Sequence, residues 1–255
     1  MKWWNVNRAY RSTRRLARVL VVLIRYGFGE VLHRMNLARP ALKVSRLVRR
    51  GTGPSPGLEG SVGERLRMAL EELGPTFIKL GQLLATRPDL LPPDIIAQFQ
   101  RLQRHVPPLP FSQIRPVIEQ ELGAPLESLF ASFDEEPMGS ASIAQVYRAR
   151  LPWGRDAAVK VIKPGIEKQV MADLDILETL AVMLENRVEE SRQFRPGKVV
   201  EQFRRSIRRE MDLTFEAYSM VRFGQEFEGD ESVLIPEVFW ERCSSRILTM
   251  ELMEG

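Results

Sequence analysis

Lys160 combines a residue type and a setting that point to chemistry, because it stands inside an apolar segment, Ala157–Ile162, that predicts a β-strand. An ammonium in such a strand is costly unless another group pairs with it. A lysine held in this way is suited to phosphate, to which it presents a point charge. The alternative is a solvated lysine, because Val159 and Val161 indicate only that Lys160 points away from them.

Four small residues lie upstream of this strand, at a turn between two further predicted strands. Their backbone N–H groups can approach a phosphate closely, because no large side chain intervenes. The alternative is a hairpin turn without a ligand, and by itself this pattern is a weak indicator of function. The four residues are Gly139, Ser140, Ala141 and Ser142.

Three carboxylates on a later predicted helix, at about 197–227, are candidates to pair with Lys160. The register of the helix against the sheet is not fixed by the sequence, so Glu210, Asp212 and Glu216 all remain open. A solvated acidic face is the alternative interpretation. Together the lysine, the small-residue loop and the acidic helix predict a site that holds nucleotide phosphates.

The composition limits the class of protein. The chain has 255 residues, 44% of them hydrophobic and 27% charged, as in an ordinary folded domain. The single cysteine, Cys243, excludes a disulfide scaffold and a thiolate metal cluster. The two histidines, His33 and His105, leave little for a zinc site or a histidine-based triad. The chain therefore fits a reducing compartment.

The positive charge is concentrated at the N-terminus. The net charge is +4, but residues 1–50 hold 13 Lys and Arg against the single acid Glu30 and so carry +12. Residues 8–26 predict a basic amphipathic helix whose apolar run, Val19–Ile24, is too short to span a membrane. We expect either contact with anionic lipid or packing on the body of the protein. Nucleic acid is not expected as a partner, because no nucleic-acid-binding fold follows the arm.

The remaining chain predicts an α+β organisation. A Gly-, Pro- and Ser-rich linker at 51–63 precedes a helical region at 64–125, and strands with long helices fill 126–255. The predicted helices lie at about 61–73, 75–85, 93–104, 112–122, 167–190 and 197–227, with Ser112 as the cap of the fourth. The predicted strands lie at about 130–135, 143–150, 157–162, 233–239 and 246–251. This order suits a five-stranded antiparallel sheet with helices against one side.

At these residues the chain resembles the UbiB/ADCK (AarF-type) atypical protein-kinase-like family. The strand residues Ala157–Lys160 read A-A-V-K and resemble the V-A-[IV]-K strand that presents a lysine to the nucleotide in kinase folds, with alanine in place of the first valine. The segment Phe77–Gln82, followed by Leu84–Pro92, resembles the K-x-G-Q hallmark of the family. Gly139 and Ser140 depart from the alanines that are common in the corresponding loop.

The resemblance implies a kinase-like small lobe after a helical extension, binding ATP or ADP with Mg²⁺. It implies that Lys160 holds the phosphates, that Glu210 orients Lys160, and that Glu251 to Met253 form the hinge toward the adenine. It also implies that Lys79 and Gln82 lie over the nucleotide cleft. ATPase or small-molecule kinase activity would support ubiquinone or related quinone synthesis, with quinone-pathway enzymes as partners, at the inner face of a membrane on the cytoplasmic side.

The second half of a kinase active site is not present in the sequence. No catalytic-loop H-x-D…N and no D-F-G follow residue 251, so the sequence predicts an N-terminal portion with the large lobe missing. We therefore expect no phosphoryl transfer by this chain alone, and we assign no metal ligands within it. The competing hypothesis is a non-catalytic adaptor on a membrane surface with a vestigial nucleotide cleft.

Overall fold

The structure is a computed structural model, and it describes only part of the chain. Side chains are described from residue 13 onward within the ranges given below. Residues 38–50 of the basic arm and most of the predicted linker at 51–63 lie outside the described residues. The described residues are 3–37, 60–102, 107–230 and 232–253.

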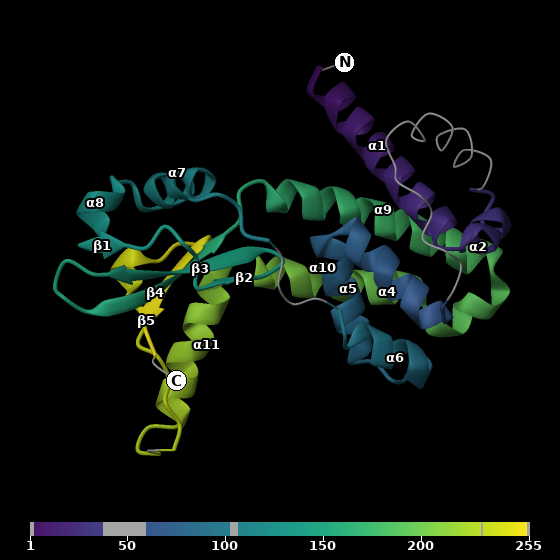
Figure 1. The fold of residues 1–255 in the computed structure, drawn as a ribbon. Helices are drawn as coiled ribbons and strands as arrows, with labels where there is room; N and C mark the ends of the chain where they lie inside the picture. Colours follow the sequence, from purple (N-terminus) through teal and green to yellow (C-terminus); the bar gives the residue numbers. More distant parts are fainter. Residues whose placement is uncertain (1–2, 38–59, 103–106, 231, 254–255) are drawn as a thin grey trace. The chain divides into compact units, whose positions relative to one another are not determined.

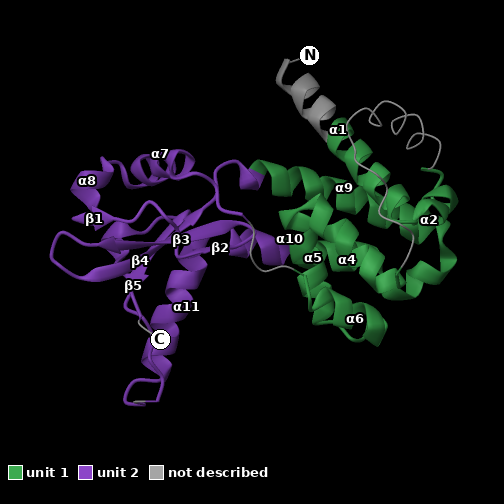
Figure 2. Cartoon of the chain, viewed as in Figure 1, with its two compact units in different colours: residues 1–103, 168–204 green, residues 104–167, 205–255 purple. Residues whose placement is uncertain are grey.

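The chain divides into two compact units that are interleaved in sequence (Figure 2). Unit 1 consists of residues 1–103 and 168–204, and unit 2 consists of residues 104–167 and 205–255. Each unit therefore takes one stretch from either half of the sequence. The expected boundary near residue 126 stays a prediction; the helix predicted at 112–122 belongs to unit 2.

Unit 1 is helical (Figure 1). Ser61 and Glu64 form a capping box that starts α4, and Gly74 ends it with a φ of 94° before Pro75 opens α5. The helices predicted at 61–73 and 75–85 are thereby confirmed, whereas the third is shorter than predicted and ends at Phe99. The elements are α1 (Trp3–Arg25), α2 (Gly29–Arg34), α4 (Val62–Leu73), α5 (Pro75–Ala85), α6 (Pro93–Phe99), a 3₁₀ turn (Glu189–Phe194), and most of α9 (Ile166–Arg187) and of α10 (Pro196–Glu210), whose remaining residues belong to unit 2.

Gly81, the glycine of the K-x-G-Q segment, allows α5 to pack closely in unit 1. A Cβ atom at this position would lie 2.8 Å from Leu70 Cδ1 and closer still to Leu102 Cδ1. Non-bonded carbon atoms in proteins do not approach each other this closely, so both leucine side chains would have to move. The glycine therefore allows α5 to lie close to Leu70 of α4 and to Leu102, independently of any other role of the segment.

We expect Gly81→Ala to lower the free energy of unfolding by about 1 kcal/mol, because overpacking costs roughly 1–3 kcal/mol and the gain in helix propensity returns less than 1. Gly224→Ala is the matched control, since Gly224 is also helical and a Cβ there meets nothing within 4 Å. The control should raise the free energy of unfolding by roughly 0.5–1 kcal/mol. Urea unfolding followed by circular dichroism compares the two, and equal shifts would contradict the packing argument.

Unit 2 is built on a five-stranded antiparallel sheet of order β1-β3-β4-β5, in which β2 also pairs with β3. The prediction of a strand at 233–239 is wrong. Within this range Val238 alone pairs with the sheet, through an isolated bridge to Met250. The fifth strand is instead the short β2, which holds the first two residues of the small-residue loop. The strands are β1 (Ser132–Phe133), β2 (Gly139–Ser140), β3 (Ala144–Arg150), β4 (Asp156–Ile162) and β5 (Ile247–Glu251).

Helices cover both faces of this sheet, rather than the one face expected (Figure 1). The core forms where α7 and α8 pack on the face that carries Val159 and Val161. On the other face α11 packs against β5 and reaches Lys160. The helical elements of unit 2 are α7 (Phe111–Leu122), α8 (Leu126–Leu129), α11 (Leu213–Glu226) and a 3₁₀ turn (Trp240–Arg242).

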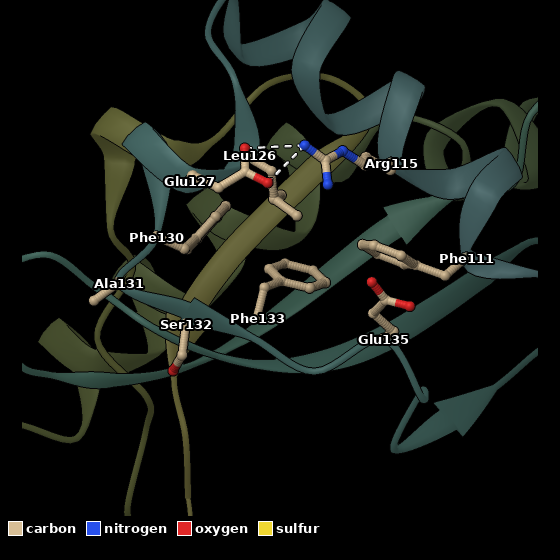
Figure 3. Close-up of a pocket in the computed structure, with 9 residues that line it drawn as sticks. All are labelled: Phe111, Arg115, Leu126, Glu127, Phe130, Ala131, Ser132, Phe133 and Glu135. Carbon is tan, nitrogen blue, oxygen red and sulfur yellow. Dashed lines mark hydrogen bonds and ion pairs between the residues drawn. The ribbon is translucent and has the colours of Figure 1, made fainter.

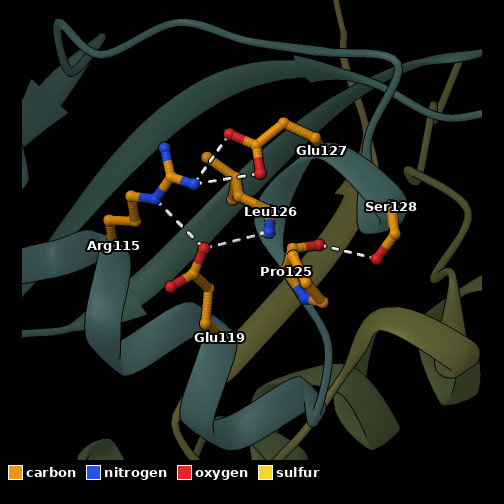
Figure 4. Close-up of polar contacts among 6 residues, drawn as sticks. All are labelled: Arg115, Glu119, Pro125, Leu126, Glu127 and Ser128. Carbon is orange, nitrogen blue, oxygen red and sulfur yellow. Dashed lines mark hydrogen bonds and ion pairs between the residues drawn. The ribbon is translucent and has the colours of Figure 1, made fainter.

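Arg115 fastens α7 to α8 (Figure 4). Its guanidinium donates to Glu119 at 3.0 Å and to both carboxylate oxygens of Glu127 at 2.7 and 2.9 Å. Gly123 ends α7 in the left-handed conformation with a φ of 72°, directly after the predicted end at residue 122. The predicted cap Ser112 is wrong, because the helix begins at Phe111 and Ser112 already lies inside its first turn.

The helix predicted at 197–227 is two helices. α10 ends at Glu210, and Asp212 takes an extended conformation as the N-cap of α11. Its carboxylate accepts a hydrogen bond from the backbone N–H of Thr214 at 3.1 Å, which replaces a backbone partner that a continuous helix would supply. The break changes which carboxylates reach the sheet.

Candidate functional site

Lys160 lies in the middle of the unit 2 sheet, on the face opposite the core. Residues paired across an antiparallel sheet share a face, and Lys160 pairs with Val146 on β3 and with Leu248 on β5. Val146 in turn pairs with Gly139 on β2, so one row leads from the small-residue loop to Lys160. The sheet therefore places the predicted loop and the predicted lysine on the same row.

Glu216, on the first turn of α11, is the partner of Lys160. The ammonium donates to both carboxylate oxygens, at 2.8 and 2.7 Å, and 26% of the lysine side chain stays exposed. The expectation that Glu210 takes this place is corrected, because the break at Asp212 puts Glu210 at the end of α10 instead. Glu216 was one of the three candidates that the sequence left open.

Three apolar residues beside Lys160 were missed by the sequence reasoning. Val146 pairs with Lys160, whereas Ala158 stands two positions before it and pairs with Met250. All three share the face of Lys160, and Val146 and Met250 are partly exposed. They form an apolar floor next to a fixed cation, which suits a flat ring attached to phosphate. The alternation of the two strands was the signal that could have identified them.

The small-residue loop forms a tight hairpin at the edge of this face. Gly139 and Ser140 make up β2, and the N–H of Ala141 donates to the carbonyl of Ala144 at 2.9 Å, which leaves a two-residue turn. Ser142 in that turn is 5% exposed. A Cβ on Gly139 would meet nothing within 4 Å, so this glycine faces open space and is not required for packing.

Lys163 is a second lysine at the site, and the sequence reasoning gave it no role. Lys163 is 5% exposed. Its ammonium donates to Ser140 Oγ at 3.0 Å and to the carbonyl of Ala141 at 2.7 Å. Burial lowers the pKa of this ammonium, because the charged form loses hydration. Its position just after β4, beside the turn of the β2–β3 hairpin, explains why a strand pattern could not reveal it.

The expected hinge residues lie at the end of β5. The carboxylate of Glu251 accepts hydrogen bonds from Arg155 Nη2 at 2.9 Å and from the backbone N–H of Glu237 at 3.4 Å. Met253 is exposed. Glu251 pairs with Ala157, three residues from Lys160 on β4, so the hinge segment leaves the sheet beyond the apolar floor. Its contact with adenine stays a prediction.

Lys79 and Gln82 lie on α5 in unit 1, whereas Lys160 and the small-residue loop lie in unit 2. Their spacing of three residues puts them on one face of α5, and both are partly buried. Their position over a nucleotide cleft stays a prediction. In the same unit the R-P-D turn is fixed by Arg87, which donates to Asp89 at 2.9 and 2.7 Å and to Gln202 at 2.9 Å.

The basic N-terminal helix is anchored in unit 1 by its own arginines. Arg15 donates to both oxygens of Asp173, at 2.6 and 2.9 Å, and to the carbonyl of Leu73 at 2.7 Å. The Asp173 side chain is fully buried, and Arg25 forms a further ion pair with Glu72. Three apolar residues of the helix, Val19, Leu20 and Val22, are buried as well, which favours the packing alternative for this part of the arm.

A cavity of about 210 Å³ lies elsewhere in unit 2, between α7, α8 and β1 (Figure 3). Phe111 and Phe133 stack in it with ring centroids 5.5 Å apart, and both pack on the core face of the sheet. Lys160 points to the opposite face, so this cavity is not the predicted phosphate site. Its lining also includes Arg115, Leu126, Glu127, Phe130, Ala131, Ser132 and Glu135.

Two features are absent from the described residues, a cluster of metal-ligating side chains and a helix able to span a membrane. No group of three or more His, Cys, Asp or Glu side chains in the described part of the chain is arranged to hold a metal ion. Among the helices of that part, none has both the length and the apolar character needed to cross a bilayer.

The antiparallel sheet, the strand lysine paired with a helix glutamate and the small-residue hairpin define the small lobe of a kinase-like fold. Residues 101–255 match the ABC1 atypical kinase-like domain. This match covers more than half of the chain, so the protein belongs to the ABC1 atypical kinase-like family, and the resemblance seen in the sequence is confirmed.

Curated relatives carry the name "Probable protein kinase UbiB". The protein from Aeromonas salmonicida is 42% identical over 250 residues, which cover 96% of this chain and 45% of that protein. The protein from Marinobacter nauticus is 41% identical over 241 residues, covering 94% of this chain and 44% of that protein. The chain thus spans slightly less than half the length of the curated relatives it matches.

A solved structure supports the fold. The Mycobacterium tuberculosis protein Rv3197, in a structure titled as its complex with erythromycin, matches with a TM-score of 0.51 and 24% identity. The match covers 85% of this chain and 51% of that protein. At this identity the likeness concerns the fold alone.

Proposed function

We propose that unit 2 binds ATP or ADP on the sheet face that carries Lys160. The observation that supports this most directly is the double hydrogen bond between Lys160 and Glu216, beside a hairpin of small residues. The carboxylate keeps the ammonium extended over the sheet, where it presents a localised positive charge to phosphate. Membership of an atypical kinase-like family supports the same ligand independently.

The residues of this face fit the parts of a nucleotide. Val146, Ala158 and Met250 offer an apolar surface for the adenine ring, and the segment from Glu251 to Met253 borders it. The hairpin at residues 139–142 offers backbone N–H groups to the phosphates. When bound, ATP supplies a transferable phosphoryl group. We propose Mg²⁺ as its counter-ion without assigning ligands to it.

We further propose that the protein supports ubiquinone, or a related isoprenoid quinone, as an atypical kinase or ATPase. The support is the identity of about 40% to relatives named UbiB. Quinone-pathway enzymes are the proposed partners, at the inner face of a membrane. Contact with anionic lipid would use the charge of residues 8–26 rather than their apolar face, because Val19, Leu20 and Val22 are already buried.

A fluorescence titration with ATP that carries an N-methylanthraniloyl (mant) label tests the nucleotide proposal on the 255-residue chain. We expect saturable binding that unlabelled ATP and ADP displace. The membrane proposal is tested separately, by measuring the binding of the protein to liposomes of anionic lipid at low and at high salt. Labelled nucleotide that does not bind, or that excess ATP does not displace, would contradict the nucleotide proposal.

A further inference from the structure

Lys163 is buried without a carboxylate among the hydrogen-bond acceptors shown for it. Its ammonium is held by one hydroxyl and one backbone carbonyl, those of Ser140 and Ala141. Its backbone N–H also donates to the carbonyl of Ile143 at 2.9 Å. The residue therefore contacts both sides of the hairpin turn, through its backbone on one side and its side chain on the other.

Burial of this ammonium costs hydration free energy, a cost that an apolar side chain at the same position would not have. A lysine loses hydration free energy on burial, and an apolar residue of similar length would fill the same volume without that cost. The hydrogen bonds that compensate this cost are accepted by two oxygen atoms of the loop. The loop and the lysine are consequently coupled: a change in the loop conformation would leave the buried charge without acceptors.

The hydrogen bond to Ala141 also sets the direction of a peptide group. The peptide between Ala141 and Ser142 is planar and trans, so its N–H points opposite to its carbonyl. When Lys163 holds the carbonyl, the N–H of Ser142 is directed away from the ammonium. One side chain thus fixes the orientation of a backbone donor in the small-residue loop.

We propose that Lys163 is the positioning residue of the phosphate loop, holding residues 140–142 in the conformation that accepts the phosphates of a nucleotide. The inference rests on the proposed nucleotide function and adds a determinant that acts through the loop. Lys160 supplies the charge that meets the phosphates, whereas Lys163 fixes the backbone around them. Its loss should weaken binding of the phosphate chain and leave the adenosine part unaffected.

Lys163→Met tests this inference. Lys168→Met is the control, because it also removes one positive charge but from an exposed lysine. The first readout is hydrogen–deuterium exchange of peptides covering residues 139–145 in the nucleotide-free protein. We expect exchange there to rise about tenfold in Lys163→Met, the effect of losing one hydrogen bond of ordinary strength, and to stay unchanged in Lys168→Met.

The second readout is the ratio of the dissociation constants for mant-ATP and mant-adenosine. Lys163→Met should weaken mant-ATP by about tenfold and mant-adenosine by less than about twofold. Lys163→Arg should restore most of the loop protection, because a guanidinium also donates to the carbonyl. If Lys163→Met does not fold, Lys163→Arg and Ser140→Ala are compared in its place, and Ser140→Ala should raise loop exchange above that of Lys163→Arg.

The outcomes separate this inference from the nucleotide proposal. Unchanged loop exchange, or an equal loss of mant-ATP and mant-adenosine binding, overturns the role of Lys163. If Lys160→Ala abolishes mant-ATP binding while Lys163→Met does not alter it, the nucleotide function stands and this inference falls. If the unaltered protein does not bind mant-ATP, the nucleotide function fails and the phosphate part of this inference fails with it.

Discussion

Lys160→Ala should weaken ATP binding by about 10- to 150-fold, because it removes a charge-assisted contact worth roughly 1.5–3 kcal/mol. The fold should survive, since 26% of the lysine side chain is exposed and its partner Glu216 is 37% exposed. Titration with mant-ATP measures the effect, and circular dichroism confirms folding. ATP affinity equal to that of the unaltered protein would remove Lys160 from the site.

Glu216→Gln should show a smaller loss of ATP affinity in the same titration, because the lysine keeps its charge and loses only the group that orients it. We expect about 3- to 10-fold, the range of one neutral hydrogen bond exchanged for a charged one. Glu226→Gln is the control on the same helix, where the carboxylate pairs with the exposed Arg222. A loss in the control as large as in Glu216→Gln would contradict the orienting role.

Asp173→Ala should have the largest effect on stability of any change proposed for this chain. The carboxylate is fully buried and holds Arg15 by two hydrogen bonds, so its removal leaves a guanidinium without its counter-charge. Breaking a buried pair costs about 3–5 kcal/mol, and we expect about 3 because 16% of the Arg15 side chain reaches solvent. The urea midpoint should fall by roughly 1 M or more.

Asp175→Ala is the matched control for this experiment. Asp175 lies two residues further along α9. Its side chain is 46% exposed and contacts Arg204. Exposed pairs contribute about 0–1 kcal/mol, so the control should lose little stability. A double substitution of Arg15 and Asp173 by Met and Leu should recover much of the loss, since an apolar pair leaves no buried charge. Equal destabilisation by Asp173→Ala and Asp175→Ala would contradict the prediction that the buried pair of Asp173 contributes more stability than the exposed contact of Asp175.

The sequence predicted the strand around Lys160 and the helix ends at residues 73 and 122, where Gly74 and Gly123 follow, because local patterns encode them. Apolar alternation, a glycine with positive φ and a proline in the first turn act within a few residues. The same locality explains the error at 233–239, whose composition favours a strand but which pairs with the sheet only through Val238. Pairing depends on distant partners that a window of sequence does not contain.

The site was predicted in its parts rather than in its contacts. The choice between Glu210 and Glu216 turned on the cap at Asp212, which interrupts a segment with a continuous helical pattern. Lys163 was invisible because its role depends on a loop that lies more than twenty residues away in sequence. Arg15 was counted with the solvated charge of the arm, whereas it pairs with a buried carboxylate 158 residues away.

The central claim is that Lys160 meets the phosphates of a bound nucleotide, and an ATP acyl-phosphate probe tests it directly. The amine of a lysine beside the phosphates attacks the acyl carbonyl, and the nucleotide phosphate leaves, so the acyl group marks that lysine. Peptide mass spectrometry of the 255-residue chain should find the label on Lys160, with the signal suppressed by excess ATP. Labelling that excess ATP does not suppress, or that spares Lys160 and marks exposed lysines such as Lys168, would contradict the account.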